Sequence, residues 1–302
     1  MKRKVVVTGG GGFVGSHLVK ALLERGDEVH TIDTFILGKD PAYLHDEATY
    51  HEVDIRDEKA VEEIVKGSSV VFHTAAIPSV QYSLEHPLET QAVNVDGTLS
   101  VIEAVRKTEG CRLVFMSSAA CYGDQETVPF LETFPSRPKS PYGMHKYMGE
   151  IMLKTWHDIY GFPCVALRCF NIYGPRMRSV GAYASAIGIF LRQKKAGEPL
   201  TIIGDGKQTR DYIHVRDIAR ANILAGESDK VGSAEVINIG SGVETSVNDI
   251  AALIGGETIN LPPRIEPRTS LADITKAKEL LGWQPTISFK EGIEELKKLT
   301  LS

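Results

Sequence analysis

A glycine-rich turn near the N-terminus constrains the fold of this 302-residue chain more than any other feature. An apolar run (residues 4–8) leads into the turn, and an amphipathic helical pattern (residues 13–25) follows it. Between them, TGGGGFVG contains the spacing G-x-G-x-x-G. Glycine lets the backbone approach a pyrophosphate, and the N–H groups of a helix N-terminus favour that anion. The pattern predicts a dinucleotide site formed by Gly9, Gly12, Phe13, Val14 and Gly15, with a ligand-free tight turn as the alternative.

Short apolar runs alternate with helical patterns through the first half of the chain. Several of the runs are apolar throughout, as in strands that are covered on both faces. This alternation predicts the α/β class: a Rossmann domain (1–170) with a doubly wound parallel sheet. Strands are expected at 4–8, 28–33, 50–53, 70–73, 112–117 and 164–168, and helices at 13–25, 58–65, 88–107 and 142–159.

Beyond Asn171, glycines and prolines separate shorter elements. We interpret residues 171–302 as a smaller C-terminal domain that covers and binds the substrate. Some of its elements are expected to return to the main sheet.

Charge and cysteine usage exclude several classes of partner. Thirty-four basic against 39 acidic residues give a net charge of -5 without a basic stripe, so no nucleic-acid partner is expected. The N-terminal apolar run is too short for a signal peptide or a membrane span. The four cysteines form neither a CxxC pair nor a zinc-ligand spacing. We therefore expect a cytoplasmic protein with reduced thiols, no metal and no membrane partner.

Asp33 ends the second expected strand, where a carboxylate can accept hydrogen bonds from both ribose hydroxyls of a dinucleotide. A 2′-phosphate would meet like charge there, and neither Thr34 nor Phe35 supplies a compensating arginine. The position favours NAD over NADP. A carboxylate that only caps a turn or a helix is the alternative.

Tyr142 and Lys146 lie four residues apart, on one face of an expected helix. A phenol with a pKa of about 10 is a poor base at neutral pH. A neighbouring ammonium and a positive nicotinamide ring would favour the tyrosinate, which could then remove a hydroxyl proton. Ser117 and Ser118 end the fifth expected strand, where such sheets place their chemistry, and one of the two could equally be a turn cap. The spacing YxxxK alone is common on solvated helices.

Nine motifs spread along the chain carry a resemblance to a known family. The chain resembles the extended short-chain dehydrogenase/reductase family and, within it, the NAD-dependent epimerases and dehydratases of the UDP-glucose 4-epimerase kind. The motifs are TGGGGFVGSH (8–17), VDIRD (53–57), FHTAA (72–76), HPLETQAVNVDGTL (86–99), SSAACYG (117–123), SPYGMHK (140–146), LRCFNIYGPR (167–176), TRDYIHVRDIA (209–219) and SLADITKAKELLGW (270–283).

The resemblance implies roles for individual residues. It implies Ser118, Tyr142 and Lys146 as catalytic, with Tyr142 and Lys146 also touching NAD. Around the cofactor it implies that Asp54 and Ile55 contact the adenine and that Ala75 and Ala76 contact the middle of NAD. It implies that Asn94 stabilises the nicotinamide half. Around the substrate it implies Asn171 and Arg210 at a diphosphate, for which the planar guanidinium is suited.

Two positions of the last motif bear on the substrate. The family places an arginine ahead of SLAD, for which Arg264 is the nearer match and Arg268 the alternative. Ser270 matches the position that leaves or closes space beside the second carbon of the sugar, and a serine there leaves room for an N-acetyl group.

The resemblance therefore implies an NAD-dependent nucleotide-sugar 4-epimerase. Related dehydratases and decarboxylases carry acids next to the catalytic serine or threonine, where this chain has Ala119 and Ala120. A reductase or dehydrogenase of nucleotide sugars with net redox is one alternative, and a non-catalytic dinucleotide-binding protein is another. Relatives form homodimers through a four-helix bundle, which here would use residues 88–107 and 142–159, although packing on the sheet could also account for their apolar faces.

Overall fold

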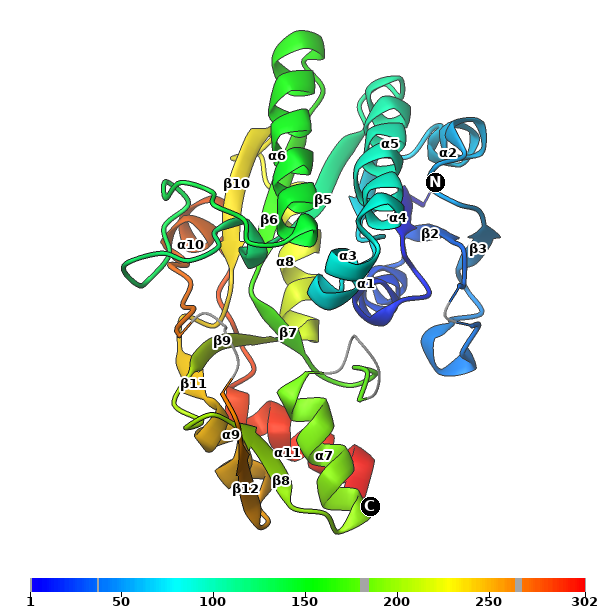
Figure 1. Cartoon of the computed structure of the whole chain (residues 1–302). Coiled ribbons are helices and arrows are strands. Elements are labelled where there is room, and N and C mark those ends of the chain that lie inside the picture. Colours follow the sequence, from blue (N-terminus) through cyan, green and yellow to red (C-terminus); the bar gives the residue numbers. More distant parts are fainter. Residues whose placement is uncertain (1, 37, 180–184, 264–267, 302) are drawn as a thin grey trace.

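The computed structural model describes residues 2–36, 38–179, 185–263 and 268–301. Its centre is a seven-stranded sheet with the order β10-β6-β5-β4-β1-β2-β3, in which every neighbouring pair is parallel (Figure 1). The predicted α/β Rossmann fold is confirmed. Its strands are β1 (Lys4–Thr8), β2 (Glu28–Asp33), β3 (Thr49–Glu52), β4 (Val70–His73), β5 (Arg112–Ser118), β6 (Cys164–Cys169) and β10 (Ser233–Ile239).

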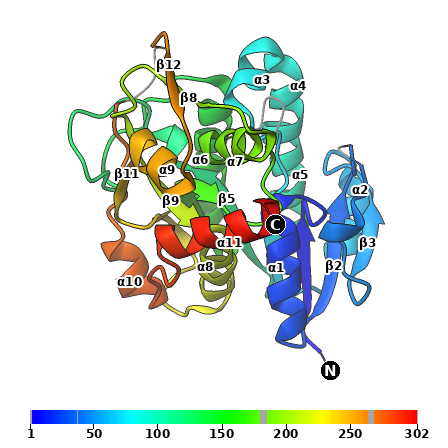
Figure 2. The ribbon, with the colours of Figure 1, turned by 90° about the horizontal axis from the view of Figure 1, so that it is seen from below.

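Helices cover both faces of this sheet (Figures 1 and 2). Alternate residues of a strand point to opposite faces, so Val5 and Val7 join one buried cluster while Val6 joins the other. The first cluster packs against α1 (Phe13–Glu24), α8 (Val215–Glu227) and α10 (Thr275–Leu281), and the second against α2 (Glu58–Val65), α5 (Gly97–Arg106) and α6 (Pro141–Tyr160).

Elements from beyond residue 170 also build the main layer. Strand β10 pairs with β6 in a register that sets Ile237 beside Leu167, and α8 packs along α1. The second half of the chain thus supplies one edge strand and part of one helical layer.

The remaining elements form the smaller part of the molecule, below the sheet in Figure 1. A buried cluster containing Phe190, Leu200 and Ile250 holds its helices against its strands. It comprises a sheet of β7 (Asn171–Tyr173), β9 (Thr209–His214) and β11 (Glu244–Ser246), the pair β8 (Leu200–Ile203) and β12 (Thr258–Leu261), and α7 (Ala186–Ala196), α9 (Val247–Ile254) and α11 (Phe289–Leu301).

The helical stretch predicted over residues 88–107 is present, and it contains one π-helical turn that the sequence analysis did not predict. After α3 (Val80–Glu85) the chain forms α4 (Pro87–Gln91), then a π-helical turn (Ala92–Asp96), and only then α5. A π turn shifts the phase of the side chains, and here it contains Asn94, whose amide binds the backbone of Ile77. A tertiary contact therefore accompanies the π turn, and helical periodicity in the sequence does not predict that turn. No helix within the described ranges is long and apolar enough to cross a membrane.

A buried ion pair joins α6 to β6. The guanidinium of Arg168 donates from Nε to Glu150 Oε1 at 2.8 Å and from Nη2 to Oε2 at 2.7 Å, and both side chains are only 4% exposed. Glu150 Oε1 also accepts from the hydroxyl of Ser117 at 2.5 Å. Because each charge is desolvated, either one left alone would be strongly unfavourable.

Glu150→Ala is expected to lower the free energy of unfolding by about 3–5 kcal/mol, because it leaves the Arg168 guanidinium buried without its counter-charge. Urea denaturation followed by circular dichroism measures the change. Replacing both partners by methionine should recover much of the loss, since no charge then remains buried.

The matched control is Asp158→Ala, which removes the exposed ion pair with Lys154 on the same helix. It should cost less than about 1 kcal/mol. Equal losses for the two alanine variants would contradict the assignment of a special role to the buried pair.

Candidate functional site

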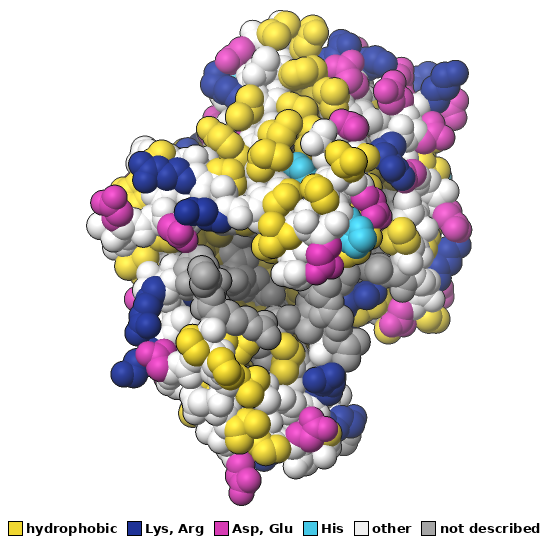
Figure 3. Space-filling view, in the orientation of Figure 1, with side chains coloured by type: hydrophobic (Ala, Val, Ile, Leu, Met, Phe, Trp, Pro, Cys, Tyr) yellow, Lys and Arg dark blue, Asp and Glu magenta, His cyan; other side chains and the backbone are white. Residues whose placement is uncertain are grey.

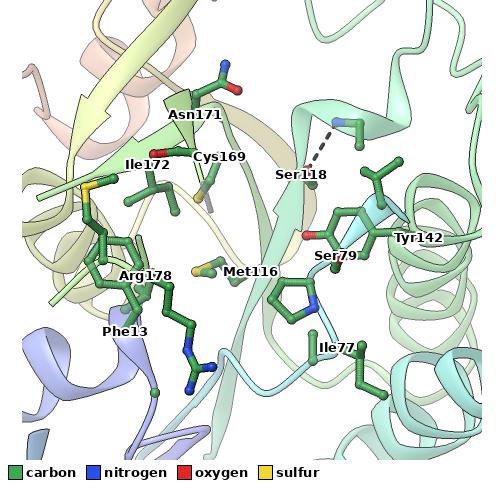
Figure 4. A pocket seen from close by; sticks show the side chains of 18 of the residues that line it. Phe13, Ile77, Ser79, Met116, Ser118, Tyr142, Cys169, Asn171, Ile172 and Arg178 are labelled. Carbon is green, nitrogen blue, oxygen red and sulfur yellow. Dashed lines mark hydrogen bonds between the residues drawn. The ribbon is translucent and has the colours of Figure 1, made fainter. Parts of the chain in front are cut away.

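A cleft of about 1630 Å³ lies at the carboxyl ends of the central strands, between the main sheet and the smaller part (Figure 4). The sheet order reverses at β1, which lies between β2 and β4. Ligands of open α/β sheets bind where such a reversal separates the following loops. Predicted site residues that line the cleft are Gly9, Gly12, Phe13, Val14, Gly15, Asp33, Asp54, Ile55, Ala75, Ala76, Ser118, Tyr142, Asn171, Arg210 and Ser270.

The glycine-rich turn is closed too tightly for side chains. Gly9 has a φ of +72°, and a Cβ on Gly15 would lie 2.0 Å from the Gly9 carbonyl oxygen. Helix α1 begins after Gly12 without a side-chain cap and without an acidic residue in its first turn. Its free N–H groups and positive dipole end therefore favour an anion at the cleft.

Two carboxylates, those of Asp33 and Asp54, line the cleft. Asp33 accepts from the N–H groups of Gly11 (2.9 Å) and Phe35 (2.8 Å), which fix its orientation and leave further lone pairs for ribose hydroxyls. Asp54 is engaged by Arg56, with Nη2 and Oδ2 2.6 Å apart, and this hydrogen bond lowers the pKa of Asp54.

Asn94 does not line the cleft. Its side-chain oxygen accepts from Ile77 N–H at 2.8 Å, and its amide nitrogen donates to the Ile77 carbonyl at 3.0 Å. Ile77 itself lines the cleft. Asn94 therefore fixes the segment after β4 and reaches a bound ligand only through it.

Ser118 and Tyr142 face one another across the inner end of the cleft. In Figure 4 the Tyr142 hydroxyl points toward the middle of the pocket, next to Ser118. Ser118 also accepts from Ala120 N–H at 3.1 Å. Of the two serines, Ser117 is turned into the core toward Glu150, because successive residues of β5 face opposite sides of the sheet.

Burial governs the protonation of the pair Tyr142 and Lys146. Burial raises the pKa of Tyr142 well above its usual range, although the hydrogen bond with Ser118 opposes the shift. Burial lowers the pKa of Lys146 to about 8, and its ammonium donates to the Met116 carbonyl at 2.8 Å. The expectation that Lys146 and a positive nicotinamide ring together favour the tyrosinate stays a prediction, and burial of Tyr142 opposes ionisation of its phenol.

Strands β7 and β9 and the segment around Ser270 also line the cleft. Asn171 donates to the Asp211 carbonyl at 3.2 Å, and Arg210 lines the cleft from the next strand. Arg268 is exposed and pairs with Asp205, with Nη2 and Oδ2 3.3 Å apart, and it is not among the lining residues. Arg264 lies outside the described residues.

Sequence reasoning missed a contact across the outer end of the cleft. Tyr43 donates from its hydroxyl to the Arg176 carbonyl at 2.6 Å, and the Arg176 guanidinium carbon lies 5.6 Å from the centre of the Tyr43 ring. Both residues line the cleft. Arg176 ends the motif LRCFNIYGPR, which was a usable signal, whereas Tyr43 lies in a segment without periodicity.

No group of three or more His, Cys, Asp or Glu side chains that could hold a metal ion occurs within residues 2–36, 38–179, 185–263 and 268–301. All four cysteines are free and buried.

Known proteins with similar sequences act on nucleotide sugars. The sequence profile of the NAD dependent epimerase/dehydratase family matches residues 5–240. A putative UDP-glucose 4-epimerase of Methanocaldococcus jannaschii is 39% identical over 301 residues, covering 97% of this chain and 96% of that protein. A UDP-N-acetyl-alpha-D-glucosaminuronate decarboxylase of Bacillus cytotoxicus is 33% identical over 318 residues, covering 98% and 97%.

Solved structures agree with these matches. A UDP-N-acetylglucosamine 4-epimerase from Methanobrevibacter ruminantium, in complex with UDP-N-acetylmuramic acid, superposes with a TM-score of 0.92 at 35% identity, over 99% of this chain and 98% of that one. The UDP-glucose 4-epimerase of Thermus thermophilus, solved with NAD, gives 0.87 at 34% identity over 99% and 97%. These matches show that the chain belongs to the NAD-dependent epimerase/dehydratase family.

Proposed function

We propose that this protein is a nucleotide-sugar 4-epimerase that interconverts UDP-glucose and UDP-galactose and also accepts UDP-N-acetylhexosamines. The observation that carries the proposal is the shared cleft. The Tyr142 hydroxyl and Ser118 lie next to one another in it, and the glycine turn, Asn171 and Arg210 line the same cleft. A proton-transfer group is thus placed between a dinucleotide site and cationic and amide groups suited to a diphosphate.

The cleft fits NAD on two observations from the glycine turn. Gly11 and Gly12 line the cleft without side chains, and α1 begins without a cap that would compete for an anion. Gly12 to Gly15 would hold the pyrophosphate and Asp33 the ribose. A bound NAD would supply the hydride chemistry at carbon 4 of the sugar.

Tyr142 moves the proton of the sugar 4-hydroxyl. Its raised pKa keeps the phenol protonated in the empty cleft, so deprotonation has to follow the arrival of positive charge. Ser118 holds the sugar oxygen by a hydrogen bond, and Lys146 supplies a fixed charge behind the phenol. Asn171 and Arg210 hold the diphosphate while the oxidised sugar rotates, so the sugar stays bound between the two half-reactions.

The residues after Ser118 favour epimerisation over elimination or decarboxylation. Ala119 and Ala120 line the cleft and carry no acid. A reaction that expels water or carbon dioxide needs a proton donor beside the keto sugar, and neither position supplies one. The absence of an acid at both positions supports the proposed epimerase over a decarboxylase.

We also propose that the protein is a cytoplasmic homodimer, as the sequence predicts. The support for a dimer is an apolar surface over α6 and the neighbouring helices α3 and α4 (Figure 3). It contains Leu84, Leu88, Met144, Ile151 and Ile159, each at least 40% exposed. Pairing of this face with a second copy would bury these side chains.

Tyr142→Phe should lower kcat for the conversion of UDP-galactose by about 10²–10⁴-fold, because the variant keeps the ring but loses the transferable proton. The assay incubates the protein with UDP-galactose without added cofactor and separates the UDP-sugars by chromatography. Tyr160→Phe, at the exposed end of the same helix, is the control and should retain activity. Full activity of Tyr142→Phe would refute the mechanism.

The charge of Lys146 predicts an alkaline decline in activity. The ammonium is charged below its pKa, which burial lowers to about 8, and it loses the charge as pH rises through that value. We expect kcat/KM of the wild type to fall above this pH. Lys146→Arg should be slower but should show no decline there, because a guanidinium stays protonated. If kcat/KM of Lys146→Arg fell at the same pH as in the wild type, the alkaline decline would belong to a group other than Lys146.

Ser270→Tyr should separate the two substrate classes. The larger side chain would fill space beside the sugar, so turnover of UDP-N-acetylglucosamine should fall by at least about tenfold while that of UDP-galactose stays within about threefold. Competing incubations with both sugars measure the ratio directly. Equal losses on both substrates would show that Ser270 does not border the N-acetyl position.

A further inference from the structure

Asp211 is a carboxylate buried behind the substrate wall of the cleft. Its side chain is fully inaccessible to solvent, and it is not among the residues that line the cleft. It accepts hydrogen bonds from Ser241 N–H (2.5 Å), Ser241 Oγ (2.7 Å), Gly242 N–H (3.0 Å) and Ala272 N–H (3.1 Å). Because burial disfavours its charge and raises its pKa, these donors have to compensate for the lost water.

Three segments that are distant in the sequence meet at this carboxylate: strand β9, the turn at residues 240–242 and the segment 270–273. The fit is close, since a Cβ on Gly240 would lie 2.6 Å from Asp211 Oδ2 and 2.7 Å from Ala272 Cβ. Small displacements of any one segment would therefore break hydrogen bonds to the others.

Two of the three segments carry residues that line the cleft, namely β9 and the segment around Ser270. Arg210 immediately precedes Asp211, and Asn171 binds the Asp211 carbonyl from β7. Ser270 lies two residues before Ala272, whose N–H is one of the four donors.

Further backbone bonds hold the segment around Ser270 on both sides. Before it, the Arg268 carbonyl accepts from Thr209 N–H at 2.9 Å. After it, Phe130 pairs with the strip that follows, donating to the Leu271 carbonyl at 2.7 Å and accepting from Asp273 N–H at 3.1 Å. Asp211 is the side chain that ties this strip to β9, and thereby sets the distance between Ser270 and Arg210.

We propose that Asp211 is a positioning residue that fixes the diphosphate and sugar walls of the cleft relative to one another. The role rests on the proposed epimerase function, since it names which substrate groups the wall holds. Asparagine at this position would keep the shape of the side chain but would turn an N–H₂ group toward backbone donors. The wall would then loosen without loss of the residues that touch the substrate.

Asp211→Asn should raise KM for UDP-galactose by about tenfold, which corresponds to about 1.4 kcal/mol, and should change kcat by less than about threefold. The matched control is Asp217→Asn. Asp217 is 1% exposed and accepts from Thr286 and Ile287 N–H groups, but it does not line the cleft and lies on α8 in the main layer. Asp217→Asn should lower the free energy of unfolding and leave KM for UDP-galactose unchanged.

Hydrogen exchange supplies a readout that does not need turnover. In Asp211→Asn the amides of residues 269–274 should exchange faster than in the wild type, whereas Asp217→Asn should affect residues 284–288 instead. Wild-type exchange together with a wild-type KM would overturn the role of Asp211. If Asp211→Asn exchanges faster but the wild type itself converts none of the UDP-sugars, the structural link is retained and the epimerase function is overturned.

A milder variant covers the case in which Asp211→Asn does not fold. Ser241→Ala removes one donor to Asp211 and leaves the three backbone donors in place. It should raise KM in the same direction by a smaller factor. An unchanged KM in folded Ser241→Ala, with unchanged exchange at residues 269–274, would contradict the proposal.

Discussion

The carboxyl ends of β1 and β4 are fixed to each other by side chains as well as by strand pairing, and the cleft depends on this junction. Thr8 Oγ1 and His73 Nδ1 lie 2.7 Å apart in a hydrogen bond, and His73 Nε2 bonds Thr98 Oγ1 of α5 at 3.0 Å. Burial lowers the pKa of His73 to about 3, so the ring is neutral and can join two hydroxyls without a buried charge. The glycine turn follows from β1 and Ala75 from β4, so both walls of the cofactor site start at this point.

Buried carboxylates perform a similar task elsewhere by joining segments that the sequence keeps far apart. Glu150 joins β5, β6 and α6, and by accepting from Ser117 it fixes the end of the strand that presents Ser118. Asp211 joins β9 to two later segments, and Asp217 holds the chain after α10. A charged acceptor makes stronger hydrogen bonds than a neutral one, provided that every lone pair left by water finds a donor.

The parts of the site that sequence reasoning reached are local. The glycine spacing, Asp33 at the end of a strand, and Tyr142 four residues before Lys146 all follow from the period of one element and its position in the strand–helix alternation. Sequence patterns did not predict features in which a side chain contacts a residue that is distant in the sequence. The π turn at residues 92–96 accompanies the bond between Asn94 and Ile77, and the contact of Tyr43 with Arg176 joins two segments with no shared pattern.

By itself, the sequence determined the α/β class, the order of the first strands and helices, and the glycine-rich turn between β1 and α1, because these depend on short-range periodicity and on backbone sterics at glycine. Only the tertiary structure decided that the Ser117 hydroxyl turns to Glu150, that burial raises the pKa of Tyr142, and that Arg268 pairs with Asp205. Those outcomes depend on burial and on partners brought together by folding. Desolvation and hydrogen-bond geometry are properties of the packed chain, and no local pattern encodes them.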